Sequence, residues 1–115
     1  MNLKKFKRLN LGISYYQYRI AKYLENKDLS DSTIKLRLVM IGNELRAKRK
    51  LLNDYGTKAM ADELTMRGFK CYNQQVIAVE YGRAYSKDLL VKYIEVLKDL
   101  LQSQGKEPLN LNKIF

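Results

Sequence analysis

The fold of this chain is decided by Ile41-Gly42-Asn43-Glu44-Leu45-Arg46-Ala47-Lys48-Arg49-Lys50 and, further along, by Gln75-Val76-Ile77-Ala78-Val79-Glu80-Tyr81-Gly82-Arg83. In each stretch the apolar residues recur three or four positions apart, which is the spacing of one face of an α-helix. Both stretches are therefore predicted to be helical. The first is rich in cations, and the second contains one amide side chain, that of Gln75.

Helical spacing extends over most of the chain. Serine caps and glycine breaks divide it into five expected helices. They are Ser14 to Asn26, Ser30 or Ser32 toward Leu52, a short helix near Thr57, Asn73 to Glu80, and a last helix from Ser86 to before Gly105 and Pro108. Only Gly68 to Tyr72 offers a candidate strand. The sequence therefore predicts an all-α protein.

Length and composition predict one domain. The chain has 115 residues, 46% of them hydrophobic, which suffices for one compact core. It contains neither a run of eighteen apolar residues nor the apolar segment of a signal peptide. We therefore expect a soluble, cytoplasmic protein that does not enter a membrane.

The sequence argues against an enzyme and against a metal site. It contains no histidine and a single cysteine, Cys71. A His-containing zinc site and an internal disulfide are therefore excluded, and the commonest general base is missing. Cys71 is expected to be a half-buried apolar residue instead of a nucleophile. We expect no catalytic residue, metal or cofactor.

The positive charge is concentrated near the N-terminus. The chain has a net charge of +10, and residues 1–27 hold seven cations against Glu25, which gives 7 − 1 = +6. A basic arm of this kind can follow phosphates and release their counterions. The alternative interpretation is a solvated tail, and charge alone does not separate DNA from RNA or an anionic membrane.

Several motifs, in order, resemble the Cro and lambda-repressor family of helix-turn-helix proteins. The family's first helix carries an apolar-Gly-x-x-Leu-Arg-x-x-Arg sequence, similar to Ile41 through Arg49. Its second helix is similar to Met60-Ala61 and Leu64. Its recognition helix ends in a sequence similar to Val79-Glu80-Tyr81-Gly82-Arg83. Ser86, Leu89 and Leu90 are similar to the opening of its next helix.

The resemblance implies a helix-turn-helix bundle of five or six helices, repressor-like, with an extra N-terminal helix. The chain would then be a single helix-turn-helix domain, 1–115, with three parts. These are a basic N-terminal extension over 1–33, a helix-turn-helix core over 34–104, and a C-terminal tail over 105–115.

The recognition helix would place its early, exposed side in the major groove of DNA. We expect four residues to contact bases, namely Asn73, Gln74, Ile77 and Ala78. Asn and Gln can pair bidentately with adenine, and Ile77 could touch a thymine methyl group. Val76 and Val79 would face the core. The alternative interpretation is a polar helix side that only faces solvent.

Other residues are expected to contact the DNA backbone and set the register of the protein. They are Thr57, Lys58, Arg67, Lys70, Tyr72, Arg83, Tyr85, Lys4, Lys5 and Lys7. Arg46 is open between two roles, because in the family a first-helix Arg often pairs with the Glu that ends the recognition helix. Here that Glu is Glu80.

One departure from the family pattern lies between the second helix and the recognition helix. Leu64 and Glu80 are sixteen positions apart, about five more than the family pattern has. The extra residues fall within Thr65 to Tyr72. They predict either a loop that carries Arg67 and Lys70 to the backbone or an extended excursion packed by Phe69.

The sequence-based function is therefore sequence-specific binding of double-stranded DNA, as a bacterial, phage or plasmid transcriptional regulator. The family commonly binds palindromes as a dimer. A homodimer contact would come from the N-terminal helix, the last helix or the apolar tail 109–115, and the tail could instead dock on a partner protein or on the core. Two alternatives stay open: an accessory DNA-binding protein of plasmid conjugation, replication or partition, and a small phage-type inhibitor of an acidic host protein.

Overall fold

The computed structural model describes residues 32–83 and 86–111, and all regular structure in these ranges is helical. The helices are α3 (Ser32–Arg49), α4 (Thr57–Met66), α5 (Asn73–Glu80) and α6 (Lys87–Ser103). The all-α prediction is confirmed. The described ranges hold four helices instead of the expected five or six, and the expected helix over 14–26 lies outside them.

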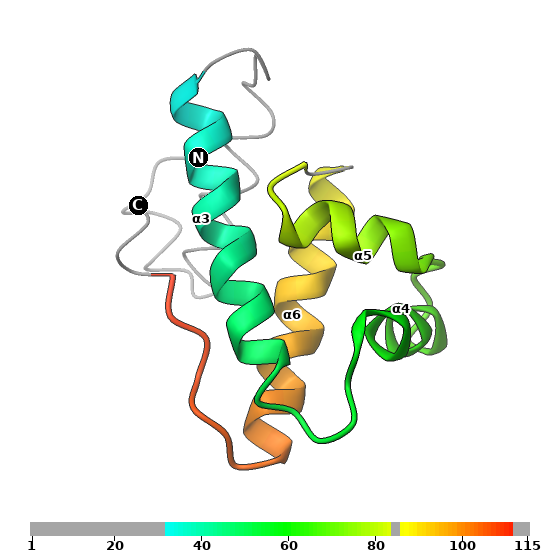
Figure 1. The fold of residues 1–115 in the computed structure, drawn as a ribbon. Coiled ribbons are helices and arrows are strands. Elements are labelled where there is room, and N and C mark those ends of the chain that lie inside the picture. The colour runs from blue at the N-terminus through cyan, green and yellow to red at the C-terminus, as the bar shows by residue number, and fades with distance from the viewer. Residues whose placement is uncertain (1–31, 84–85, 112–115) are drawn as a thin grey trace, which may run out of the picture.

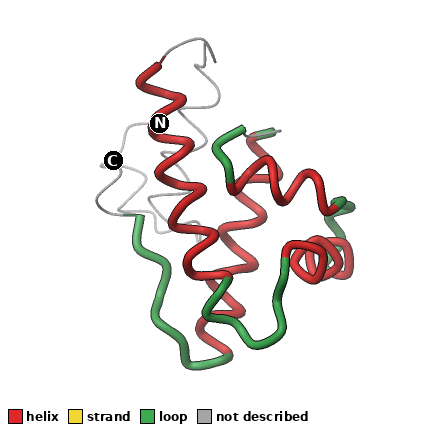
Figure 2. The backbone as a smooth tube through the Cα atoms, in the orientation of Figure 1, coloured by secondary structure: helices red, strands yellow, loops and turns green. Residues whose placement is uncertain are grey.

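The helices form two pairs. Helices α3 and α6 run side by side, and α4 and α5 lie against them (Figure 1). In this view α4 is seen along its axis while α5 is seen from the side, so the two helices meet at a steep angle. Loops over residues 50–56 and 67–72 join α3 to α4 and α4 to α5 (Figure 2). The arrangement from α4 to α5 is a helix, a turn and a second, steeply crossing helix.

The core is built from the apolar stripes that the spacing predicts. Val76 and Val79 of α5 are buried as expected, and Tyr93 of α6 is fully buried. The other buried apolar side chains of the four helices are Leu38, Ile41, Leu45, Met60, Ala61, Leu64, Ala78, Leu89, Leu90, Ile94, Val96, Leu97, Leu100 and Leu101.

Helix α3 ends at Arg49, three residues before the predicted Leu52. The amides of Leu51 and Leu52 donate to the carbonyls of Lys48 and Arg49, at 3.0 Å each, and tighten the chain into turns. Asp54 then adopts a left-handed conformation with φ of 62°. Leu52 is buried nevertheless. An apolar side chain is needed at this buried position, and it also fits the spacing of a helix longer than the one observed.

The long turn before α5 is a packed helix cap, and the candidate strand over 68–72 is wrong. Gly68 has φ of 94°, and the amides of Gly68 and Phe69 donate to the carbonyls of Thr65 and Leu64. This pair of bonds is the Schellman motif that closes a helix. The Thr65 hydroxyl accepts from the amide of Cys71 at 3.1 Å. Phe69 packs against the core, so the excursion belongs to the domain.

Helix α6 begins and ends as the sequence predicts. The Ser86 hydroxyl accepts from the amide of Leu89 at 3.1 Å, which satisfies a free donor of the first turn. Asp88 lies in that turn, where a negative charge is favourable. Beyond Ser103 the chain leaves the helix at Gly105, whose φ is 64°.

The C-terminal segment folds back beside α3 (Figure 1). Leu111 is buried in the core, and Glu44 accepts from the amide of Asn110 at 2.7 Å. Lys48 lies 3.1 Å from Glu44 and 3.4 Å from Glu107. Burial lowers the pKa of Lys48, but the two carboxylates outweigh burial and the net pKa is raised. The described part of the tail therefore docks on its own core.

Gly42 of α3 lies directly against the backbone of α5 at Val79 and Glu80. A Cβ atom placed there would lie 2.7 Å from the carbonyl carbon of Glu80 and 2.8 Å from the carbonyl oxygen of Val79. Both are backbone atoms, which cannot rotate away as a side chain could. Gly42 therefore sets how near α5 sits to α3.

We predict that Gly42→Ala lowers the free energy of unfolding by about 2–3 kcal/mol, because α5 must shift to admit the methyl group. Urea unfolding followed by circular dichroism measures the change. Gly56→Ser is the matched control, since nothing lies within 4 Å of a Cβ at Gly56. Equal stabilities for Gly42→Ala and the wild type would contradict the close contact.

Candidate nucleic-acid interface

A buried ionic network joins the end of α5 to α3 and α6. Arg49 donates to both carboxylate oxygens of Glu80, from Nε at 2.6 Å and from Nη2 at 2.9 Å. Its third contact, from Nη1, is to the carbonyl of Tyr55 at 3.0 Å. The Tyr93 hydroxyl donates to Glu80 Oε2. Glu80 is almost fully buried, so its charge is satisfied inside the protein.

The network shifts the pKa of two of its members. The bidentate hydrogen bond with Glu80 raises the pKa of Arg49. Burial, followed by the charge of Glu80, raises the pKa of Tyr93 well above its ordinary value. The two shifts favour a charged guanidinium and a neutral phenol.

Of the two roles left open for Arg46, the ion pair with Glu80 is wrong, because Arg49 forms that pair. Arg46 lies one turn earlier on α3, donates to Asn43 Oδ1 at 2.9 Å, and stacks over the Tyr81 ring at 4.7 Å. Both arginines meet the C-terminal end of α5. Arg49 binds the buried Glu80, and Arg46 lies over the exposed Tyr81, the next residue along the chain.

We predict that Glu80→Gln and Arg49→Gln each cost about 3–5 kcal/mol of stability, because each leaves one buried charge without its partner. Arg46→Gln is the matched control on the same helix and should cost about 1 kcal/mol or less. Urea unfolding compares the three variants. A larger loss for Arg46→Gln than for Arg49→Gln would contradict the assignment.

We also predict a stability loss in alkali that depends on Tyr93. Its raised folded pKa means that the folded state keeps a proton that the unfolded state loses above about pH 10. The contribution of Tyr93 is therefore fully present below pH 10 and declines as pH rises further. Thermal unfolding should show that the difference in melting temperature between wild type and Tyr93→Phe becomes smaller as the pH rises from 8 to 11. A constant difference would contradict this.

Helix α5 presents one face to solvent. Gln74 and Tyr81 are exposed and Ile77 is half-buried, and their spacing of three and four positions puts them on one side. Asn73 lies at the edge of this face and is half-buried. Its Oδ1 atom is buried, and no donor reaches it within the described part of the chain. One end of the Asn73 amide therefore points inward.

Ala78 does not lie on the exposed side, and this prediction is wrong. Its side chain is only 6% exposed, and it joins Val76 and Val79 among the buried residues of the helix. The buried side of α5 therefore includes Ala78 as well as Val76 and Val79. Ala78 is therefore removed from the candidate base contacts.

Most of the described backbone-contact candidates reach the surface. Lys58 is 81% exposed and forms an ion pair with Asp62 at 3.5 Å, while Thr57, the first residue of α4, is half-buried. Around α5, the exposed candidates are Lys70, Tyr72 and Arg83. The remaining candidates, Tyr85, Lys4, Lys5 and Lys7, lie outside the described residues.

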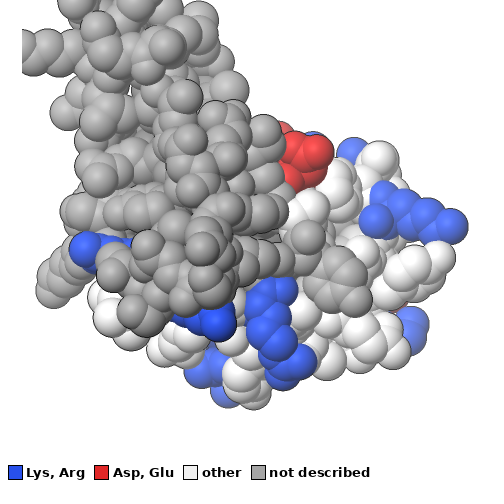
Figure 3. Space-filling view, turned by 90° about the horizontal axis from the view of Figure 1, so that it is seen from above, with Lys and Arg blue, Asp and Glu red and all other residues white. Residues whose placement is uncertain are grey.

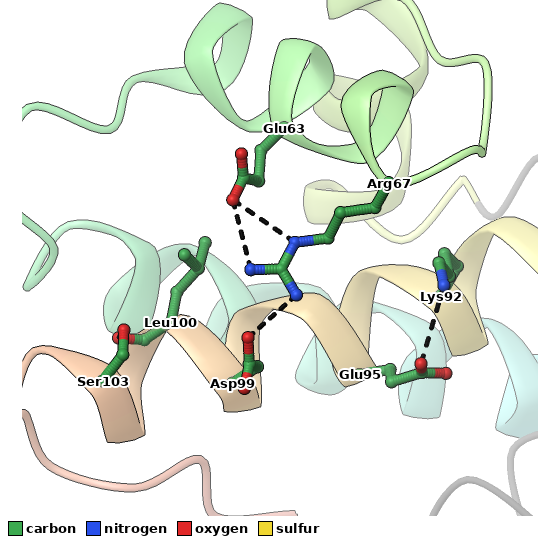
Figure 4. A network of polar contacts seen from close by, with 7 residues as sticks. All are labelled: Glu63, Arg67, Lys92, Glu95, Asp99, Leu100 and Ser103. Atoms are coloured by element: carbon green, nitrogen blue, oxygen red, sulfur yellow. Dashed lines mark hydrogen bonds and ion pairs between the residues drawn. The ribbon is translucent and has the colours of Figure 1, made fainter.

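Arg67 is also exposed, but two carboxylates hold its guanidinium. It donates to Glu63 Oε1 from Nε at 3.3 Å and from Nη2 at 3.2 Å, and to Asp99 Oδ2 at 2.8 Å (Figure 4). The bond with Asp99 is the main cause of its raised pKa. Arg67 therefore ties α4 to α6. The sequence predicts that the turn brings Arg67 to a DNA phosphate. In the structure its guanidinium binds the carboxylates of Glu63 and Asp99 instead.

The sequence-based prediction missed Tyr81 and the position of Arg46 beside it. Tyr81 follows the last residue of α5, and its ring is 55% exposed at the end of the same face as Gln74. The spacing 74, 77 and 81 was the available signal. In the sequence, Tyr81 is conspicuous only as part of the motif that ends the helix.

Figure 3 shows one face of the molecule from above, where Lys and Arg side chains are more prominent among the described residues than Asp and Glu. Two other kinds of chemistry, a reactive thiol and a metal site, are disfavoured among the described residues. Cys71 is buried, and burial raises the pKa of its thiol, which disfavours the reactive thiolate. Within residues 32–83 and 86–111, no cluster of acidic and sulfur ligands suits a metal ion. None of the described helices combines the length and apolar character needed to span a bilayer.

Comparison with protein-family models, with curated proteins and with solved structures finds no match to this chain.

Proposed function

We propose that this protein binds double-stranded DNA in a sequence-specific manner, with α5 as a recognition helix of the repressor type. The observation that carries the proposal is the exposed face of α5. It combines an amide and a half-buried aliphatic side chain, and the helix is held rigidly from behind. Such a face matches the hydrogen-bonding edges and thymine methyl groups of the major groove.

The contacts within the groove are fewer than the sequence suggested. Gln74 has an exposed side chain and is assigned the bidentate contact with adenine, and Ile77 the contact with a thymine methyl group. Asn73 has one amide atom buried, so it is assigned a single hydrogen bond. Ala78 has no part in readout.

The backbone contacts follow from exposed cations on both sides of α5. Thr57 and Lys58 open α4, where free amides and the helix dipole favour a phosphate. Lys70 and Arg83 flank α5 on its two sides in the sequence. Lys4, Lys5 and Lys7 add charge from the N-terminal extension. The protein would regulate transcription by occupying a site at or near a promoter, as a monomer or a homodimer.

We predict that selection from a random-sequence duplex pool enriches a defined motif, and that Gln74→Ala weakens the preference at specific positions. The loss should be about 1–3 kcal/mol against the preferred base, which is the discrimination of one bidentate pair. Gln102→Ala, an exposed glutamine of α6, is the matched control and should select the same motif with equal affinity.

The salt dependence separates the two classes of contact. Replacing Lys4, Lys5 and Lys7 together should lower affinity on all sequences and flatten the dependence on salt, whereas Gln74→Ala should leave that slope unchanged. Weak wild-type binding that is indifferent to sequence would contradict the proposed function. It would favour a basic surface that binds an acidic protein.

A further inference from the structure

Helix α3 carries an exposed stripe on the side that faces away from the core. Its members are spaced three or four positions apart, which places them on one side of a helix. We call them the α3 stripe, and they are Leu36, Val39, Asn43, Ala47 and Lys50, all exposed. Lys50 follows the last residue of α3, and its amide still donates to the carbonyl of Arg46 at 3.1 Å, as in a helix. The buried side chains of α3, such as Ile41 and Leu45, lie on the opposite side.

The N-terminal half of the α3 stripe is apolar. Leu36 is 59% exposed, Val39 is 40% exposed, and Met40 beside them is half-buried. Single exposed apolar residues are common on proteins, whereas neighbouring ones mark a surface that another molecule covers. Ala47, in the other half, has a small side chain that would let a second helix approach closely. This combination suits a partner helix that lies along α3.

The charges beside the α3 stripe are positive. Lys35 adjoins Leu36 at one end of the stripe and Lys50 lies at the other, and both lysines are exposed. The only acidic residue of α3 is Glu44, which is half-buried and lies 3.1 Å from the ammonium group of Lys48. No carboxylate of α3 is therefore left to pair with the two exposed lysines, and the stripe attracts negative charge.

Asn43 adds a hydrogen-bonding group in the middle of the stripe. Its Oδ1 atom accepts from Arg46 Nη2 at 2.9 Å, which leaves the side-chain nitrogen of Asn43 as a donor. A donor between two lysines favours a side chain that only accepts, and ionised glutamate and aspartate are such side chains. The stripe therefore favours acidic residues at its middle as well as at its ends.

Charge and polarity decide between the occupants that this stripe could have. Two copies of the chain would place lysine against lysine, since Lys35 would meet Lys35 in a parallel pair and Lys50 in an antiparallel pair. Each copy also carries a net charge of +10. A membrane surface would need a continuous apolar face, and Asn43 interrupts the stripe. An acidic helix fits both the apolar half and the lysines.

We propose that the α3 stripe binds an acidic amphipathic helix of a partner protein. The apolar face of that helix covers Leu36 and Val39, and its carboxylates pair with Lys35 and Lys50 and accept from Asn43. The inference goes beyond the proposed function, because it assigns α3 a protein partner and needs no DNA.

The test uses the full-length protein and a fluorescently labelled peptide of about 18 residues, which spans the stripe at about 1.5 Å per residue. The peptide has leucine on one helical face and glutamate elsewhere, and a second peptide has lysine in place of each glutamate. Binding is followed by fluorescence anisotropy at about 0.15 M salt, where distant charges are screened. The glutamate peptide should bind at least about tenfold more tightly than the lysine peptide.

Matched variants locate the contact on α3. Leu36→Gln should weaken binding of the glutamate peptide about tenfold, as expected for one lost leucine contact. Met66→Gln is its control, because Met66 is an 80% exposed apolar residue of α4. Lys35→Glu should weaken binding about fivefold, whereas Lys98→Glu, on the exposed side of α6, should have little effect.

Several outcomes would overturn the proposal. Equal losses in Leu36→Gln and Met66→Gln, or in Lys35→Glu and Lys98→Glu, would show attraction to the whole basic protein instead of a site. A wild-type dimer in sedimentation that Leu36→Gln dissociates would assign the stripe to a second copy.

Absence of peptide binding to the wild type also overturns the proposal, and two further measurements then identify the occupant. Peptide binding that appears only after removal of residues 1–27 would assign the stripe to that segment of the chain. Binding to phosphatidylserine vesicles that Leu36→Gln abolishes would assign it to a membrane. The selection of DNA duplexes decides the proposed function separately from all of these results.

Discussion

The position of α5 depends on one buried interaction, the bidentate pair between Arg49 and Glu80. Arg49 lies at the end of α3 and Glu80 at the end of α5, and Tyr93 of α6 donates to the same carboxylate. A buried carboxylate with these partners tolerates little movement, because losing either bond leaves a charge unsatisfied. Helices α3, α5 and α6 are thus joined at the Glu80 carboxylate. Gly42 allows α3 and α5 to lie close together beside this contact.

This constraint decides which side of α5 reaches solvent. With Glu80 and the two valines directed inward, Gln74, Ile77 and Tyr81 are left on the outer side of the helix. At the N-terminal end of α5, the side-chain oxygen of Gln75 accepts from the amide of Tyr72 at 2.8 Å. This bond ties the start of the helix to the turn over residues 67–72. A helix fixed at both ends presents its side chains in one geometry. Such preorganisation reduces the ordering that binding would require.

Local features of the sequence predicted the helices, and long-range contacts account for the errors. Helical spacing and the Ser86 cap are local signals, and α4, α5 and α6 begin where they indicated. The choice of Arg49 over Arg46 depends on how α3 is rotated against α5, which spacing within α3 does not determine. The capture of Arg67 depends on Asp99, thirty-two positions away. Burial of Ala78 likewise depends on tertiary packing.

Nuclear magnetic resonance of ¹⁵N-labelled protein titrated with a selected duplex tests the central claim most directly. That claim is that the buried pair fixes α5 so that its outer face meets DNA. The account predicts that the largest amide shift changes fall at the start of α4 and over residues 72–81. The polar face of α6 around Glu95, Lys98 and Gln102 should remain unchanged. Changes concentrated on that α6 face, with α5 unaffected, would contradict the account.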